Sequence, residues 1–181
     1  MNCYDYIKED IGSNKGNGVG TIFLLILYRM QRELLERQLV AHRSSFFWKL
    51  VRKLIFIPYR LLCHSYGCFL PVHARLGRRV IFKHSLYGIF ISQQAVVGND
   101  VVMLHQVTIG SNIDASNRIS APIVGDGVFI GAGAKLIGGI TVGAGAKIGA
   151  NAVVVTDIPA RATVVLNKPR IIVQSDSESC C

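Results

Sequence analysis

Aliphatic side chains recur at every sixth residue through the second half of the chain. The residue after each of them is usually glycine, and a small or apolar residue follows four positions after each. The series breaks twice and otherwise holds its period over twelve hexads. Its positions are Leu76, Phe82, Ile91, Val97, Met103, Ile109, Val124, Ile130, Leu136, Val142, Ile148 and Val154.

A period of six fits neither the helical repeat of 3.6 nor the alternation of a half-buried strand. It predicts a chain that winds around a triangular prism, with one hexad on each flat face and residues 18 apart stacked on one another. Twelve hexads then make about four turns, and each turn buries its aliphatic residues against its neighbours. We expect the glycines near the corners, where the backbone needs torsions that a Cβ opposes.

The two breaks in the period point to the functional parts of the prism. Phe82 and Ile91 are separated by three residues more than the period requires, around His84–Tyr87. Ile109 and Val124 are also three residues too far apart, and the polar stretch 111–122 between them predicts a loop that leaves the prism. Loops on a rigid scaffold commonly carry function.

The chain before the repeats predicts two or three helices. Helical spacing covers Phe23–Arg43, and a second segment runs from Ser45 to Cys63, which Pro58 is expected to kink or end. Residues 1–20 contain four glycines and are expected to be loosely structured. The predicted organisation is a helical region over 1–70, the prism over 71–160, and a C-terminal extension and tail over 161–181.

The composition narrows the class of protein. Half of the 181 residues are hydrophobic and 17% are charged, which excludes collagen, coiled coils and disulfide scaffolds. Twenty basic residues against eleven acidic ones give a net charge of +9, and the excess is spread over both halves. With no zinc finger, aromatic RNA-binding motif or basic block, no nucleic-acid partner is predicted.

Cysteines and apolar runs bear on the compartment. The cysteine count is five, an odd number, and no signal peptide is found, so we expect a cytoplasmic protein with free thiols. Cys63 and Cys68 are expected to fill apolar space.

The strongest apolar run, Ile22–Tyr28, falls far short of the roughly 20 residues that span a membrane. Basic residues punctuate the apolar ones over 46–60, so this helix either packs on the protein or makes peripheral membrane contact.

Four stretches carry a family resemblance. Gly131–Leu136 and Gly143–Ile148 both read Gly-Ala-Gly-Ala-Lys before an aliphatic residue, and Met103–Gly110 and Ile148–Pro159 are equally characteristic. The chain resembles the hexapeptide-repeat acyltransferases of the serine acetyltransferase branch, closest to relatives that acetylate sugar hydroxyls in surface polysaccharides. The resemblance implies a mainly β fold, a left-handed parallel β-helix after the N-terminal helices. It also implies a homotrimer, acetyl-CoA as donor, and active sites between subunits.

Departures from the family pattern bear on the acceptor. Lys83 stands where the branch has an Asp before its catalytic histidine, and Phe69 lies near the position of the Asp that orients it. The serine-holding Asp-Arg-His-Pro is replaced by residues 119–122, Ile-Ser-Ala-Pro. These changes favour a sugar hydroxyl as acceptor. Two alternatives stay open: a serine O-acetyltransferase of cysteine biosynthesis, and a non-enzymatic trimeric assembly scaffold.

Histidine suits O-acetylation because its ordinary pKa of about 6.5 leaves it largely neutral and basic at pH 7. His84 lies in the first break, and the resemblance puts the catalytic base there; a surface histidine on a bulge is the alternative. His105, two residues after Met103, is expected to line the acceptor pocket or a subunit contact. No pair of histidines has the spacing of a metal site, so no metal is expected.

Stacking predicts where the donor binds. Residues 132 and 150, both alanine, are 18 apart, as are the glycines 131 and 149, and small side chains there leave room for a pantetheine arm. The resemblance places CoA at this position, with residues 110 and 111 near the thioester. Two basic residues past the prism are candidates for the CoA phosphates, or else solvated charges. The predicted set is Gly110, Ser111, Gly131, Ala132, Ala150, Lys168 and Arg170. No cysteine lies in the repeats, which favours direct transfer.

Overall fold

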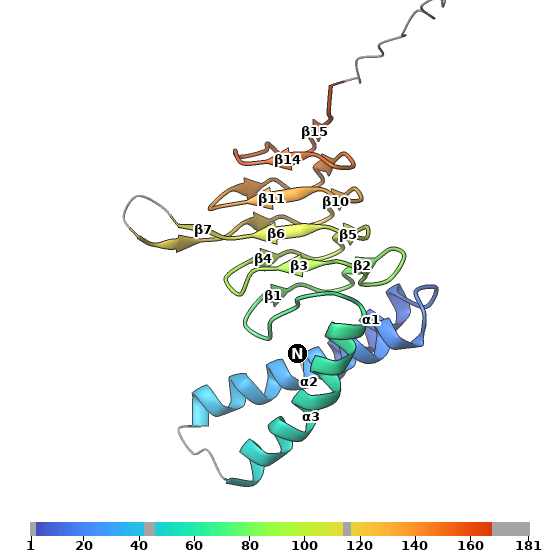
Figure 1. The fold of residues 1–181 in the computed structure, drawn as a ribbon, viewed down its shortest axis with the longest axis vertical. Helices are drawn as coiled ribbons and strands as arrows, with labels where there is room; N and C mark the ends of the chain where they lie inside the picture. The colour runs from blue at the N-terminus through green and yellow to red at the C-terminus, as the bar shows by residue number, and fades with distance from the viewer. Residues whose placement is uncertain (1–2, 42–45, 114–116, 168–181) are drawn as a thin grey trace, which may run out of the picture.

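The computed structural model describes residues 3–41, 46–113 and 117–167. Three helices, α1 (Cys3–Ser13), α2 (Val19–Ala41) and α3 (Phe46–Ser65), lie at one end of a stack of short strands (Figure 1). The strands are β1 (Arg75–Leu76), β2 (Ile81–Phe82), β3 (Phe90–Ile91), β4 (Val96–Val97), β5 (Val102–Met103), β6 (Thr108–Gly110), β7 (Asn112–Ile113), β8 (Ile119–Ser120), β9 (Ile123–Val124), β10 (Phe129–Ile130), β11 (Lys135–Ile137), β12 (Thr141–Val142), β13 (Lys147–Ile148), β14 (Val153–Val154) and β15 (Thr163–Val164).

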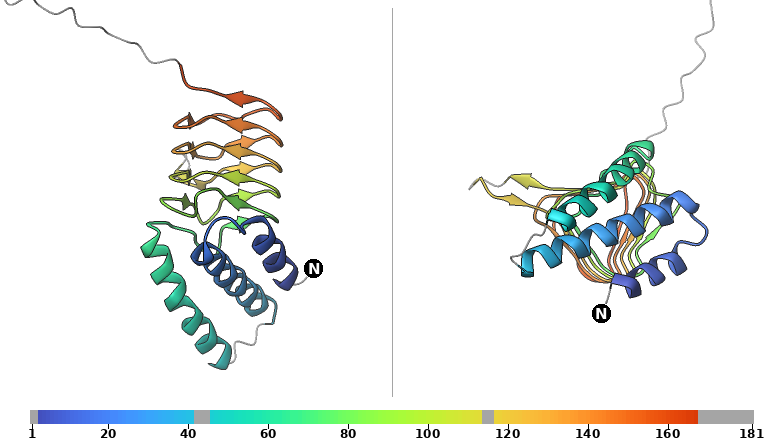
Figure 2. Two further views of the ribbon diagram at one scale, coloured as in Figure 1. Left: turned by 90° about the vertical axis from the view of Figure 1, so that its right-hand side faces the viewer. Right: turned by 90° about the horizontal axis from the view of Figure 1, so that it is seen from below.

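Three parallel sheets form the sides of the stack. Their strand orders are β1-β4-β9-β12, β2-β5-β10-β13-β15 and β3-β6-β11-β14. Ile130 pairs with Ile148 and Leu136 with Val154, so residues 18 apart lie one above the other, as the period predicts. Viewed along the stack, the coils superpose in a three-sided outline (Figure 2). The prediction of a left-handed parallel β-helix with N-terminal helices is confirmed.

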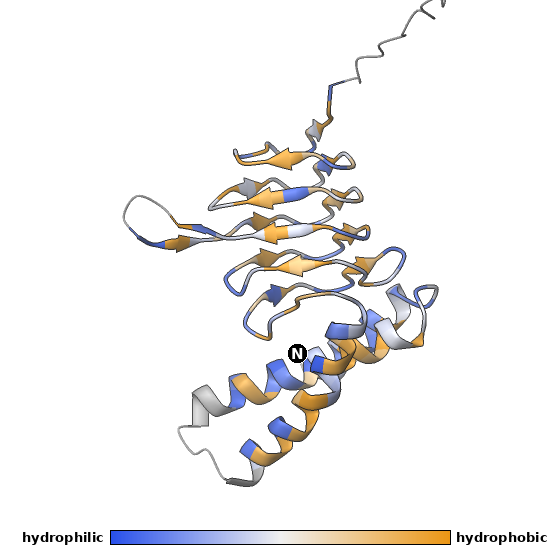
Figure 3. Ribbon diagram, viewed as in Figure 1, coloured by the Kyte–Doolittle hydropathy of each residue, from blue (hydrophilic) through white to orange (hydrophobic). Residues whose placement is uncertain are grey.

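The aliphatic residues of the hexads fill the interior of this prism. None of the twelve is more than 6% exposed, and most are fully buried. Hydrophobic residues follow the strands throughout the stack (Figure 3). Burying a branched side chain stabilises the fold by about 1.5–3 kcal/mol, so each coil depends on the next for its core.

The glycines do not act as the sequence suggested. The glycine that follows each aliphatic residue is needed for close approach between coils: a Cβ on Gly131 would lie 2.6 Å from the backbone nitrogen of Ala150. Left-handed torsions occur two residues later, at Gly133, Gly145 and also Asn151, with φ of 70°, 70° and 58°. The corner therefore has two separate requirements, one steric and one torsional.

One expectation about the helical region was wrong, and a second was wrong in part. Residues 1–20 were expected to be loosely structured, yet α1 occupies most of this stretch because it packs against α2 and the first coil. Pro58 was expected to kink or end its helix; it does not end the helix, since α3 continues through it to Ser65. Tyr59 and Cys63, just beyond Pro58, are buried against the first coil, and this packing offsets the lost backbone hydrogen bond.

Buried polar contacts dock the helices on the first coil. Arg29 of α2 forms an ion pair with Asp10 of α1 at 2.8 Å and donates to the carbonyl of Leu76. Burial raises the pKa of Asp10, and the hydrogen bond from Arg29 opposes this effect. The hydroxyl of Tyr28 donates to the carbonyl of Ala74 at 2.6 Å. The helical layer is thus tied to backbone groups of the prism.

The prism extends slightly past the predicted boundary at residue 160. Strand β15 pairs with β13, so the fifth coil continues to Val164.

At the other end of the molecule, α3 exposes several large apolar residues among basic ones. Of the helices that the structure describes, none is both long and apolar enough to cross a membrane. The exposed apolar residues of α3 are Trp48, Leu50, Leu54, Phe56, Ile57 and Leu61.

Candidate active site

Two edges of the prism hold the residues that the sequence singled out. The edge where the chain turns from the sheet of β2 to the sheet of β3 carries residues 83–89, 104–107, 131–134 and 149–152 on successive coils. We call it the histidine edge. The edge where the chain leaves the sheet of β3 carries the excursion, a two-stranded antiparallel hairpin of β7 and β8, which projects from the stack in Figure 1.

The first break in the period forms a bulge on the histidine edge. His84 and Ser85 have φ of 63° and 70°, a region that residues with a Cβ rarely adopt. Leu86 and Ile89 are fully buried and anchor the bulge in the core. The three extra residues therefore lift His84 out of the coil, where its side chain is exposed.

The helical region holds this bulge in place. Ser85 Oγ donates to the carbonyl of Asn17 at 2.7 Å and lies 2.6 Å from the hydroxyl of Thr21. The backbone N–H of Gly88 donates to the carbonyl of Tyr66 at 3.1 Å. These contacts offset the unfavourable torsions, and strained residues fixed in this way are common at functional sites.

His84 and His105 lie together on the histidine edge. Their ring centroids are 5.8 Å apart and the rings meet edge to face at 77°. His105 is half-buried, and its Nδ1 is buried without a hydrogen-bond partner in the described part of the chain. A buried ring nitrogen without a partner favours a bound ligand or a second protein group at this place.

No carboxylate among the described residues pairs with either ring. The position where the resemblance expects an orienting Asp holds Phe69, which stacks on Phe90 with centroids 6.5 Å apart. Both phenyl rings are partly exposed, at 39% and 48%. Aromatic side chains therefore lie near the bulge at the place where the resemblance predicts an acidic side chain.

The small residues predicted to receive the donor lie on the two coils that follow those of His84 and His105. The N–H of Gly133 donates to the carbonyl of His105 at 3.1 Å, and the N–H of Asn151 donates to the carbonyl of Ala132 at 2.8 Å. Ala132 is half-buried and Ala150 exposed, and each presents a single methyl group on this edge. His84, His105, Gly131, Ala132 and Ala150 thus share one edge.

Gly110 and Ser111 do not join them within one protomer. They lie at the far end of β6, beside the hairpin, and help to line a cavity of about 540 Å³ over the sheet of β3 and β6. The stacked pair Phe69–Phe90 lines the same cavity. Gly110 and Ser111 therefore lie on a different edge of the prism from His84.

Two further predictions concern the basic residues past the prism and the metal site. Lys168 and Arg170 lie outside the described residues. Across residues 3–41, 46–113 and 117–167 no group of three or more His, Cys, Asp or Glu side chains is arranged to hold a metal ion. Sequence reasoning missed the contacts of Asn17, Thr21 and Tyr66 with the bulge, because no local pattern shows which segments dock on it.

The repeats match the model of the bacterial transferase hexapeptide family (six repeats) over residues 121–156. Serine acetyltransferase 1 of Arabidopsis thaliana chloroplasts is 40% identical over 134 residues, which cover 73% of this chain and 42% of that protein. The chain thus carries the hexapeptide repeat and is similar to serine acetyltransferases over most of its own length.

Solved structures of this branch share the fold. A serine acetyltransferase in complex with CoA has a TM-score of 0.68 at 26% identity, over 89% of this chain and 65% of that one. Soybean serine acetyltransferase complexed with serine has a TM-score of 0.73 at 26% identity, over 94% of this chain and 69% of that one. This hexapeptide-repeat chain spans between 26% and 57% of the length of the curated relatives it matches. The named relatives support the serine acetyltransferase resemblance and give no support to the polysaccharide part of the prediction.

Proposed function

We propose that this protein transfers an acetyl group from acetyl-CoA to a hydroxyl acceptor, with His84 as the general base. The observation that carries the proposal is the exposed His84 imidazole on a fixed bulge. It lies next to His105 and on the same edge as a stack of small residues. The resemblance to serine acetyltransferases, one of them in complex with CoA, supports acetyl-CoA as the donor.

The chemistry needs one base and no covalent intermediate. The neutral His84 ring takes the proton of the acceptor hydroxyl while the oxygen attacks the acetyl carbon. The tetrahedral intermediate then expels the CoA sulfur, which receives the proton, and the acetyl ester is released. A backbone N–H beside the thioester would stabilise the oxyanion.

The donor site is proposed to lie between protomers of a homotrimer. Gly131, Ala132 and Ala150 would accept the pantetheine arm on the histidine edge of one chain. Gly110 and Ser111 of the next chain would reach the thioester, which fits their place on a different edge. Lys168 and Arg170 remain predicted partners of the CoA phosphates.

L-Serine is the first acceptor to consider, because the named relatives are serine acetyltransferases and one solved structure holds serine. This reverses the order in which the sequence placed the two acceptors. A sugar hydroxyl is the second candidate, favoured by one observation: Phe69 and Phe90 offer an aromatic surface on which a sugar ring can stack.

The test is CoA release by the purified protein, followed with a thiol reagent. With acetyl-CoA and L-serine, we expect release above the acceptor-free rate; if only nucleotide sugars or glycans give release, the second acceptor is correct. His84→Ala should lower the rate by about 10²–10⁴-fold. His73→Ala is the matched control, since His73 is exposed at the start of the prism and away from the histidine edge. Unchanged turnover in His84→Ala would show the base assignment to be wrong.

Two further predictions concern membrane contact and location in the cell. Contact of α3 with a membrane surface fits its exposed apolar and basic residues, and a cytoplasmic location stays a prediction. Vesicle sedimentation with anionic lipid measures the first.

A further inference from the structure

Helix α3 ends in a backbone motif that brings two cysteines together. Gly67 has a left-handed φ of 55°, and its N–H donates to the carbonyl of His64 at 3.0 Å. The N–H of Cys68 donates to the carbonyl of Cys63 at 2.9 Å. These are the two hydrogen bonds of a Schellman motif, in which the side chains of the first and last residues commonly contact each other. Here both of those residues are cysteines.

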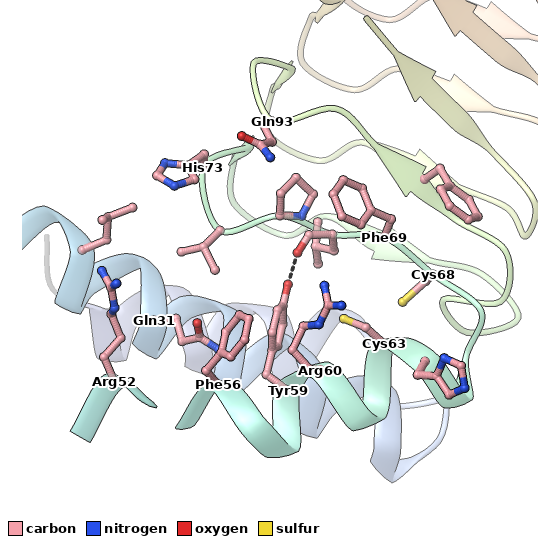
Figure 4. Close-up of a pocket in the computed structure, with 16 residues that line it drawn as sticks. Gln31, Arg52, Phe56, Tyr59, Arg60, Cys63, Cys68, Phe69, His73 and Gln93 are labelled. Carbon is pink, nitrogen blue, oxygen red and sulfur yellow. Dashed lines mark hydrogen bonds between the residues drawn. The ribbon is translucent and has the colours of Figure 1, made fainter. Parts of the chain in front are cut away.

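The two thiols face a cavity of about 400 Å³ between α3 and the first coil (Figure 4). Cys63 and Cys68 are free and almost buried, at 7% and 8% exposed, and both line this cavity. The cavity is also lined by Tyr59, whose hydroxyl donates to the carbonyl of Leu70, and by Arg60. A small polar oxidant can reach the pair through this cavity.

The surroundings make the two thiols unequal. The neighbouring Cys68 thiol, and to a smaller extent the Tyr59 hydroxyl, lower the pKa of Cys63, while burial opposes this effect. The neighbouring Cys63 and burial raise the pKa of Cys68. Thiolates are the reactive form of cysteine, so Cys63 has the character of an attacking sulfur and Cys68 that of a resolving one.

We propose that Cys63 and Cys68 form a reversible redox pair that hydrogen peroxide converts to a disulfide. The Cys63 thiolate attacks one peroxide oxygen, which gives a sulfenic acid and, after proton uptake, water. The sulfur of Cys68 then attacks the sulfenic sulfur; the S–S bond forms, and a second water leaves with the Cys68 proton. In sum, two thiols and one hydrogen peroxide give one disulfide and two waters.

The pair is next to the bulge that carries His84. Tyr66, between the two cysteines, accepts from the N–H of Gly88, and its ring lies 4.9 Å from that of Tyr87. Phe69, directly after Cys68, donates from its N–H to the carbonyl of Ile89 at 2.8 Å. A disulfide would therefore close a short loop in a segment that joins α3 to the bulge. The redox chemistry itself does not depend on acetyl transfer.

The experiment isolates the pair in the full-length chain. A variant with Cys3, Cys180 and Cys181 changed to serine keeps two of the five cysteines. It is treated with hydrogen peroxide, unfolded in N-ethylmaleimide and cleaved by chymotrypsin after Tyr66, which separates the two cysteines unless a disulfide joins them. We expect loss of both titratable thiols, a linked peptide pair without maleimide, and full recovery of the thiols with dithiothreitol.

Two further variants keep the test decisive. Adding Cys68→Ser removes the resolving thiol, and Cys63 should then stop at the sulfenic acid, which dimedone traps; adding Cys63→Ser should leave Cys68 largely unmodified at the same peroxide dose. The proposal is overturned if both cysteines of the parent carry maleimide after peroxide treatment, or if both end as separate sulfinic acids. None of these readouts uses acetyl-CoA, so a failed acetyl-transfer assay leaves this result separate.

Discussion

At the scale of single residues, the hexad glycines have a steric role that their neighbours do not share. The Cβ of an alanine at 131 would meet backbone atoms of residues 148, 149 and 150 at 2.6–2.9 Å. Backbone atoms in a ladder cannot move aside as a flexible side chain can. The requirement at Gly131 is therefore room between coils and not a special torsion.

We predict that Gly131→Ala lowers the free energy of unfolding by about 1–3 kcal/mol, through overpacking between coils. The matched control is Gly12→Ala in α1, where an added Cβ meets nothing within 4 Å. That change should be neutral or stabilising by up to about 1 kcal/mol, because alanine is the better helix former. Urea unfolding of both variants measures the difference, and equal midpoints would contradict the steric explanation.

The sequence predicted which residues of the site are special, but not how they contact each other. His84 was found because a broken period marks a bulge, and His105 because it occupies a hexad. Their contact at 5.8 Å was not predictable, since 21 residues separate them and the register across the bulge fixes their distance. Cys63 and Cys68 were interpreted as apolar filling, and only the capping geometry of α3 shows them as a pair.

At the scale of elements, the helical region is a base that positions the bulge. Asn14, after the end of α1, is fully buried: its amide donates to the carbonyl of Val80 at 2.9 Å and accepts from the N–H of Phe82 at 3.0 Å. Phe82 is the last residue before the bulge. The helical layer thus supplies hydrogen bonds that the first coil cannot obtain from a preceding one.

We predict that Asn14→Leu costs about 1–3 kcal/mol, because it leaves the carbonyl and the N–H buried without partners. Lys15→Leu at the neighbouring exposed position is the control and should change stability by less than about 0.5 kcal/mol. Thermal unfolding gives the comparison. Loss of stability in the Lys15 variant alone would argue against this docking role.

The helices also show where pattern reasoning fails for elements. A glycine-rich stretch and an internal proline both weaken a helical pattern, yet α1 and the second half of α3 are helical. Tertiary packing decides in both cases: Asp10 of α1 pairs with Arg29, and Tyr59 of α3 is buried on the first coil. Local propensity is a weak guide where such contacts exist.

At the scale of the whole molecule, the proposed active site is shared between chains. His84 and Ser111 lie on different edges of the prism, and the proposed trimer would bring these edges of neighbouring chains together. In a cyclic trimer, each site would take His84 from one protomer and Ser111 from the next.

Mixed trimers test this arrangement. His84→Ala and Ser111→Tyr chains should each be inactive alone, because one lacks the base and the other blocks the thioester position. Random mixing of equal amounts through unfolding and refolding should restore about a quarter of the wild-type rate, since one site in four then combines the two intact residues. Light scattering after size exclusion gives the oligomeric state. No recovery from mixtures that do form trimers would contradict a shared site.

The sequence by itself determined the prism, because a period of six leaves only one way to bury a regular aliphatic column. It also determined the place of His84 and of the excursion, since both interrupt that period. The tertiary structure alone decided the pairing of His84 with His105, the buried contacts that hold the bulge, and the meeting of Cys63 with Cys68. Each of these depends on how separate segments dock, through hydrogen bonds and packing that no local pattern encodes.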